Sequence, residues 1–172
     1  RVLPPRADGG ARRRRLLSCV APARRAQRAS LAGHDQCDHW CGLGGSGFDT
    51  FTPNDYTDAY VKIVFVRDDI DVSTLPQPLT LDSFNDLPVE HRPTVRTYTV
   101  RNADTERREL TIDFVVHGEH GVAGPWASAA TPGQRAFLMG PSGAYAPDPA
   151  ADWHLIAGDE AALPAISAAL EA

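Results

Sequence analysis

Short runs of alternating polar and apolar residues occupy the middle of the chain. Four runs are rich in β-branched and aromatic residues, which predicts strands at residues 60–66, 94–102, 109–117 and 135–139. Polar, proline-containing or glycine-containing turns separate them, and one short helix is predicted at residues 126–130. Several short strands with little helix indicate a mainly β fold, a small antiparallel barrel.

Two stretches depart from this alternation. Residues 68–93 contain four prolines and predict a loop with little regular structure. Near the C-terminus, residues 146–151 suit a linker. An apolar strand at 153–157, a glycine turn and a helix at 163–172 are predicted to follow. That order is the opening of a parallel α/β nucleotide-binding fold. We therefore expect a barrel domain over residues 43–148 and the start of an α/β domain over residues 149–172.

The N-terminal segment, residues 1–42, has a different composition. Its first 30 residues hold nine arginines and one acid, a net charge of +8, so the remaining residues carry −13. No apolar periodicity supports folding, and we predict a disordered, protease-sensitive tail, with a nucleic-acid or membrane-surface arm as the alternative. Zinc-ligand residue types occur at His34, Cys37, His39 and Cys41. They are too close together, without the usual spacer between ligand pairs, to predict a metal site.

Composition limits the class of protein. With 172 residues, of which 42% are hydrophobic, the chain can bury one full core. No run reaches the roughly 18 apolar residues of a membrane span, and the N-terminus lacks the apolar segment of a secretory signal. The acidic body argues against nucleic acid as a partner. We expect a cytoplasmic protein without stable membrane insertion.

Candidate chemistry lies in two segments. On the strand at 94–102, Arg96 suits a phosphate, Tyr98 a ring face and Thr99 a hydrogen bond. The second segment runs from an apolar strand into a glycine-rich turn and Pro125, which suits the first position of a short helix. Free N–H groups and the helix dipole make such a helix N-terminus favourable for anions. Together the two segments predict a site for a flat, anionic ligand.

These segments resemble the siderophore-interacting proteins, FAD-dependent ferric-siderophore reductases of the ferredoxin–NADP reductase superfamily. The resemblance covers about residue 43 to the C-terminus. It rests on several motifs in the order of the family: Tyr-Val-Lys at 60–62, Arg-x-Tyr-Thr-x-Arg at 96–101, Asp-Phe-Val-Val-His-Gly at 113–118, Gly-Pro-Trp-Ala at 124–127, Gly-Pro-Ser-Gly at 140–143 and Gly-Asp-Glu at 158–160.

The resemblance implies an FAD site. Arg96 would pair with the pyrophosphate, Tyr98 would stack on the isoalloxazine ring, and Thr99 would hydrogen-bond near its N5 atom. The other implied FAD contacts are Arg101, Asp113, Val115, His117, Gly124, Pro125, Trp126 and Ala127. Ordinary structural roles remain open for several of them, including a surface salt bridge for Arg101 and a core position for Trp126.

The resemblance also implies a reductant and a substrate. Gly158, Asp159 and Glu160 would meet NADPH or NADH, although Ala161 replaces the family's usual Thr. Lys62 would face an anionic ferric siderophore, or would be a solvated surface lysine. The implied activity is NAD(P)H-dependent reduction of ferric siderophores, which releases iron as Fe(II) in the cytoplasm.

Two other functions remain open, a general NAD(P)H:flavin oxidoreductase and a non-catalytic siderophore- or flavin-binding module. Because only one β–α unit follows the barrel, we expect that this chain is not competent alone with NAD(P)H.

The resemblance adds a hypothesis about the reading frame upstream of Leu43. Family members carry a strand similar to Pro-x-Val-Arg-Val there. Residues 38–42 can be encoded as GAC CAC TGG TGC GGN, which from the third base reads Pro-Leu-Val-Arg. Out-of-frame translation would leave the barrel without its N-terminal strand, and the nucleotide sequence tests this.

Overall fold

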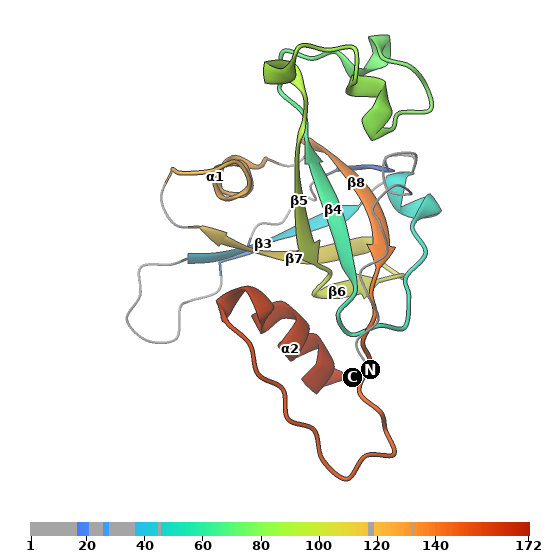
Figure 1. Ribbon diagram of the computed structural model, residues 1–172, viewed down its shortest axis with the longest axis vertical. Helices are drawn as coiled ribbons and strands as arrows, with labels where there is room; N and C mark the ends of the chain where they lie inside the picture. Colours follow the sequence, from blue (N-terminus) through green and yellow to red (C-terminus); the bar gives the residue numbers. More distant parts are fainter. Residues whose placement is uncertain (1–16, 21–25, 28–36, 45, 117–118, 132) are drawn as a thin grey trace.

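The computed structural model describes residues 17–20, 26–27, 37–44, 46–116, 119–131 and 133–172. Eight strands of this part form one antiparallel sheet in the order β5-β4-β8-β1-β3-β7-β6, with β2 paired to β3 (Figure 1). The strands are β1 (Leu17–Val20), β2 (Ala26–Gln27), β3 (Cys37–Gly44), β4 (Tyr60–Phe65), β5 (Thr94–Thr99), β6 (Asn102–Asp104), β7 (Glu109–Val116) and β8 (Arg135–Ser142). The helices are α1 (Ala123–Ala129) and α2 (Leu163–Glu171), and the 3-10 turns are η2 (Ser46–Thr50), η3 (Val72–Thr74), η4 (Leu81–Phe84), η5 (Val89–His91) and η6 (Glu160–Ala162). The predicted mainly β, antiparallel fold is confirmed.

The sheet is not the closed barrel that the pattern predicted. Its end strands, β5 and β6, share no hydrogen-bonded ladder among the described residues. The predicted strand at 94–102 is instead broken after Thr99. The N–H of Val100 donates to the Ala59 carbonyl at 2.7 Å, whereas the N–H of Arg101 donates to the Thr111 carbonyl at 2.9 Å. The amides of Val100 and Arg101 thus donate in opposite directions, the first toward β4 and the second toward β7. At this point the chain passes from β4 to β7.

The main hydrophobic core lies on one face of the sheet. On β7 the buried residues Leu110, Ile112 and Phe114 alternate with half-buried ones, as the period of a strand requires. Helix α1 packs on β7 and β3 and adds Ala123 and Ala127 to this core. The alternation found in the sequence therefore identified the face that folds inward.

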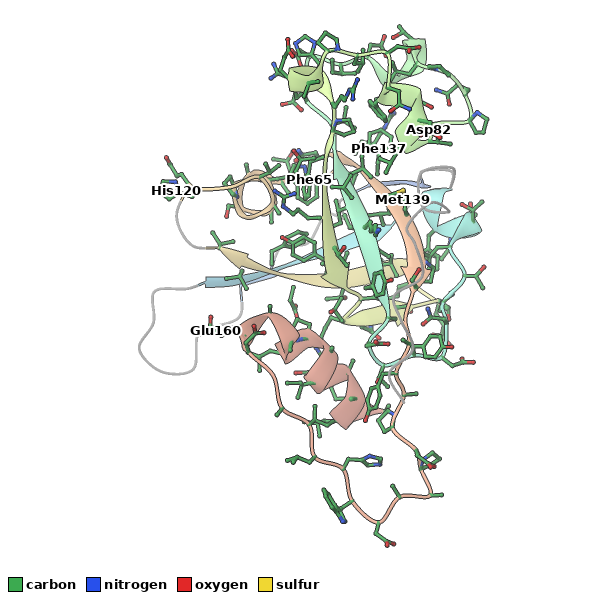
Figure 2. The ribbon with its side chains drawn as sticks, in the orientation of Figure 1. Phe65, Asp82, His120, Phe137, Met139 and Glu160 are labelled. Carbon is green, nitrogen blue, oxygen red and sulfur yellow. The ribbon has the colours of Figure 1, made fainter. Side chains whose placement is uncertain are left out.

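A second core forms where the sequence predicted only a loop. Within residues 68–93, Leu79 and Phe84 are buried against Val64, Phe137 and Met139 of β4 and β8. Figure 2 shows Phe137 and Met139 on the side of the sheet that this segment covers. The prolines and 3-10 turns break any periodicity, so the apolar residues reach the sheet without a regular spacing.

Two strands, β1 and β2, and most of a third, β3, lie inside the N-terminal segment that was predicted to be disordered. Strand β1 inserts between β8 and β3 and pairs with β8 in the register Leu17↔Leu138 to Val20↔Arg135. Strand β3 pairs with β7 from Cys37↔Val116 to Gly44↔Glu109, so the expected gap at the N-terminal strand is wrong. Backbone ladders need no apolar periodicity, which is why the pattern missed them. Cys37, His39 and Cys41 lie in β3, and His34 lies outside the described residues.

The C-terminal unit is only partly as predicted. Residues 153–157 form no strand, and Trp153 and Leu155 are 75% and 83% exposed. A strand needs a hydrogen-bonding neighbour, and no described strand lies beside this stretch. Helix α2 does form, with Pro164 in its first turn, and it lies below the sheet in Figure 1. None of the described helices has the length and apolar character needed to cross a bilayer.

Replacing Phe84 by Ala should lower the free energy of unfolding by about 3–5 kcal/mol, because the ring is 1% exposed and its loss leaves a cavity in the second core. Val89→Ala in the same segment is the control. At 75% exposure, Val89 should contribute less than about 0.5 kcal/mol. Urea unfolding measures both variants, and a Phe84→Ala effect as small as that of the control would contradict a stabilising second core.

Candidate functional site

Strand β5 presents different chemistry on its two faces. Cross-strand pairing places Tyr98 opposite Val61 and Arg96 opposite Ile63, so both side chains lie on the main-core face. Thr97 pairs with Lys62 and Thr99 with Tyr60, so these four lie on the other face. The sequence predicted this separation of Tyr98 from Thr99, and the register confirms it. A ligand that contacts both must therefore pass along the edge of β5.

That edge of β5 is open. The Val100 amide bonds to Ala59 toward β4, and the alternation of antiparallel ladders then directs the backbone groups of Val95, Thr97 and Thr99 away from β4. The Val95 carbonyl accepts a hydrogen bond from Arg96 Nη1 at 2.9 Å, as expected for a carbonyl at an open edge. β5 therefore offers unpaired amide N–H groups on one side.

Strand β7 faces this edge with an open stretch of its own. β6 pairs only with residues 109–111 of β7, so residues 112–116 have no strand partner on that side within the described chain. β5 and β7 are neighbours without a ladder between them. We call these two open stretches, residues 95–99 and 112–116, the seam.

Aromatic side chains span the seam. The ring of Tyr98 lies 4.5 Å from that of Phe114, with an angle of 43° between their planes. Phe114 also contacts Trp126 of α1 at 5.9 Å, and Trp126 meets Phe65 at 5.5 Å. Phe65 lies beside α1 in Figure 2. The fold thus joins two predicted site residues, Tyr98 and Trp126, through Phe114, and Trp126 takes the core role that the sequence analysis had left open.

Arg96 and Tyr98 differ in their surroundings. Arg96 is exposed, and no ion pair to it is found among the described residues. Tyr98 is half-buried, and this desolvation raises the pKa of its hydroxyl, with Arg96 opposing the shift through its charge. An available guanidinium therefore stands next to an aromatic ring that is partly open to solvent.

Arg101 has an internal partner. Its guanidinium forms a two-pronged ion pair with the Glu171 carboxylate of α2, in which Nη1 donates to Oε2 at 2.8 Å and Nη2 pairs with Oε1. Asp113 of β7 lies 3.9 Å from Arg101 Nε. In this structure Arg101 therefore forms a salt bridge, the alternative role considered from the sequence. Asp113 also interacts with Arg101.

Helix α1 begins at Ala123, three residues before the predicted start. Gly124 and Pro125 therefore lie in its first turn, and Trp126 donates the first helical hydrogen bond to Val122. A methyl group on Gly124 would lie 3.3 Å from the Val115 carbonyl, so glycine allows α1 to approach β7 closely. The Ala127 side chain is fully buried and could meet a ligand only through its backbone.

Ser128 is a residue that the sequence analysis missed. Its Oγ is buried without a hydrogen-bond partner among the described residues. No sequence signal marks it, because a serine in a short helix commonly faces solvent or bonds to its own backbone. Such a hydroxyl carries a desolvation cost of about 1–3 kcal/mol.

The remaining predicted residues are spread around this region. Lys62 is half-buried on the face of the sheet opposite Arg96. Asp159 caps η6 by accepting from the Ala162 amide at 3.2 Å, and Gly158 packs against the same turn. Glu160 is exposed and begins η6 (Figure 2). His117 lies outside the described residues.

The sequence of this chain is similar to a known protein family and to proteins of other bacteria. The family model described as siderophore-interacting FAD-binding domain matches residues 40–145. An uncharacterized protein of Mycobacterium tuberculosis is 70% identical over 130 residues, 76% of this chain and 46% of the relative. The NADPH-dependent ferric-chelate reductase of Escherichia coli is 34% identical over 129 residues, 75% of this chain and 48% of that protein.

The fold of this chain is also similar to that of a solved structure. A siderophore utilization protein from T. fusca superposes with a TM-score of 0.64 at 30% identity, over 90% of this chain and 56% of that one. The chain spans about half the length of the curated relatives that it matches.

The raised pKa of Tyr98 predicts a pH effect on stability. A folded-state pKa above the ordinary value of about 10 gives stability that is present below pH 10 and is lost as pH rises through the folded pKa. Tyr98→Phe should remove this part of the decline above pH 10 and leave the pH dependence between 7 and 9 unchanged. Thermal unfolding at stepped pH measures it. An identical decline in both proteins would contradict the effect.

Ser128→Ala should leave the free energy of unfolding unchanged or raise it by up to about 1 kcal/mol, because it removes an unsatisfied buried hydroxyl and places alanine in a helix. Ser83→Ala is the matched comparison, because it removes a serine hydroxyl that does have hydrogen-bond partners. Ser83 Oγ donates to the Pro76 carbonyl at 2.8 Å and accepts from the Thr80 amide at 3.0 Å, so its loss should cost about 1–2 kcal/mol. Equal destabilisation by both would show that Ser128 has a partner.

Proposed function

Because this chain belongs to the family of siderophore-interacting FAD-binding domains, we propose that its seam binds FAD and that the protein reduces ferric siderophores. The arrangement that carries the proposal is the meeting of Arg96, Tyr98 and the open edge of β5 in one place. Whether the seam suits FAD can be judged from the chemical groups that it presents. A dinucleotide with a flavin ring needs a cation for phosphate, an apolar ring face and amide donors for ring heteroatoms.

The seam supplies each of these groups. Arg96 has N–H groups beyond the one that bonds to Val95, and these suit phosphate oxygens. The half-buried ring of Tyr98 suits a planar partner. The backbone N–H groups of Thr97 and Thr99 point to the open edge and suit acceptor atoms of a ring. These residues therefore fit the cofactor, whereas the engaged guanidinium of Arg101 is a weaker candidate.

FAD, when bound, supplies the conversion between two-electron and one-electron transfer. The residues of this chain would bind and orient it. Tyr98, held in place by Phe114, would keep water from one side of the flavin ring, and Arg96 would hold the phosphates. α1 would fix the angle between β5 and β7 through Trp126.

The reductant and substrate follow from the relatives. Similarity to the NADPH-dependent ferric-chelate reductase of E. coli supports NADPH as the electron donor, and Gly158, Asp159 and Glu160 are our candidates for its contacts. Similarity to the siderophore utilization protein from T. fusca supports a siderophore as the iron ligand. Lys62 is our candidate for an anionic ferric siderophore, since it is a cation on the Thr97–Thr99 face. A cytoplasmic location remains a prediction.

The test of the function combines cofactor retention and iron reduction. The purified chain should keep FAD through gel filtration. After reduction with dithionite and removal of the excess, it should reduce a ferric chelate, as measured with an Fe(II) indicator. Retention of FAD without iron reduction would favour a non-catalytic flavin-binding module. Failure to retain FAD, combined with reduction of added free flavin by NADPH in a separate assay, would favour a general NAD(P)H:flavin oxidoreductase.

Arg96→Ala should weaken FAD binding about ten- to hundredfold, because one charge-assisted phosphate contact contributes about 1.5–3 kcal/mol. Arg107→Ala is the control, since Arg107 lies in the turn between β6 and β7, pairs with Asp104 at 3.7 Å and is 79% exposed. Fluorescence titration gives both dissociation constants. Equal affinities of the two folded variants would remove Arg96 from the site.

A further inference from the structure

Helix α2 is joined to the sheet by the ion pair between Glu171 and Arg101. The two ends of this pair differ in exposure. The Arg101 side chain is 13% exposed, whereas that of Glu171 is 63% exposed. The guanidinium is therefore covered, and its partner can be reached by water and salt.

Little else in the C-terminal segment is strongly held. No residue of α2 is fully buried, and Leu163 and Leu170 are exposed. The hydrogen bonds found in residues 146–159 are local, such as those from Ala151 and His154 to the Asp148 carbonyl. Docking of α2 therefore rests on partial burial of residues 164–169 and on the Arg101–Glu171 ion pair.

The start of the segment, in contrast, is firmly attached. Asp58 Oδ1 accepts hydrogen bonds from the amides of Ala144 and Tyr145 at 2.8 and 2.9 Å. The Thr57 amide donates to the Tyr145 carbonyl at 2.9 Å. Gly143 lies against Tyr56, where an added methyl group would come within 2.6 Å of the tyrosine Cβ. The chain thus leaves the sheet from a fixed point.

Docked α2 covers a pocket and the Arg101 side chain. With Ala168 it closes one wall of a pocket of about 260 Å³ beside the end of β5. The other walls include Phe51, Tyr56, Val100, Arg101 and Pro141. In Figure 1 the helix lies against the same end of the sheet that β5 and β6 reach. Both Arg101 and this pocket are accessible only as far as α2 allows.

We propose that residues 146–171 form a strap with a fixed start at Asp58 and a releasable latch at the Arg101–Glu171 pair. Release is feasible because Arg101 keeps Asp113 at 3.9 Å when Glu171 leaves, so its charge is not left without a partner. Salt favours release, since it screens an ion pair with an exposed carboxylate. Opening exposes a cation at the end of β5. The use of that cation by FAD phosphates rests on the proposed function, whereas the latch does not.

Glu171→Gln tests the latch, with Glu160→Gln in the same segment as control. Reaction of Arg101 with phenylglyoxal, measured by mass spectrometry without FAD, should become about two- to fivefold faster in Glu171→Gln, as loss of a surface ion pair predicts. Exposed Arg96 is the internal reference and should react equally in all proteins. Amide exchange in α2 should accelerate by a similar factor. Raised salt should bring the wild type close to the variant.

Asp58→Ala separates the two ends of the strap. It should free the amides of Ala144 and Tyr145 to exchange faster. Labelling of Arg101 should stay unchanged, because lengthening a loop by a few residues alters its closure entropy little. Unchanged Arg101 labelling in Glu171→Gln would overturn the latch, and so would equally fast labelling in Glu160→Gln.

FAD titration tests the link to cofactor binding. Two- to fivefold tighter binding by Glu171→Gln supports competition between α2 and FAD for Arg101. Unchanged FAD affinity with an opened latch overturns that competition. If neither the wild type nor Glu171→Gln binds FAD, the proposed function fails, and the labelling result alone still decides the latch.

Discussion

Packing of Phe114 against Tyr98 and Trp126 is the contact on which the arrangement of this chain depends. Phe114 is fully buried, and it belongs to the strand that forms one side of the seam. No ladder joins β5 to β7, so side chains must hold the two strand edges together. Each aromatic pair adds about 0.5–1.5 kcal/mol to the effect of burial. The seam is thus stabilised by packing while its backbone edges stay open to a ligand.

Alternation in the sequence was enough to predict the strands that line this region. Burial in β7 follows a period of two, and the register of β4 and β5 confirms that Tyr98 and Thr99 point to opposite faces. Alternation could not predict where β5 ends. That break depends on the carbonyls of Ala59 and Thr111, which are brought to it by the rest of the sheet. The end of β5 is thus set by two hydrogen bonds to residues that alternation within the strand does not identify.

Motif resemblance predicted residue types better than it predicted their partners. It marked Arg96 and Arg101 together, and the fold then separated them. Arg96 stays exposed, whereas Arg101 pairs with Glu171, 70 residues further along the chain. The second core around Phe84 was missed for the same reason, because only the folded sheet brings Val64 and Phe137 to it. The predicted strand at 153–157 had no neighbour to pair with.

The net charge of the chain gives the different surroundings of Arg96 and Arg101 their importance for an anionic ligand. Outside its first 30 residues the chain carries −13, so its overall field opposes anionic ligands. That field is screened over about 8 Å at physiological salt, and contacts within this range decide binding. Among the residues that the structure describes, Arg96 is the exposed cation of the seam, because the charge of Arg101 is matched by Asp113 and Glu171. The two arginines therefore differ in what they can offer a ligand, because Arg96 is exposed whereas Arg101 is covered and paired with Glu171 of α2.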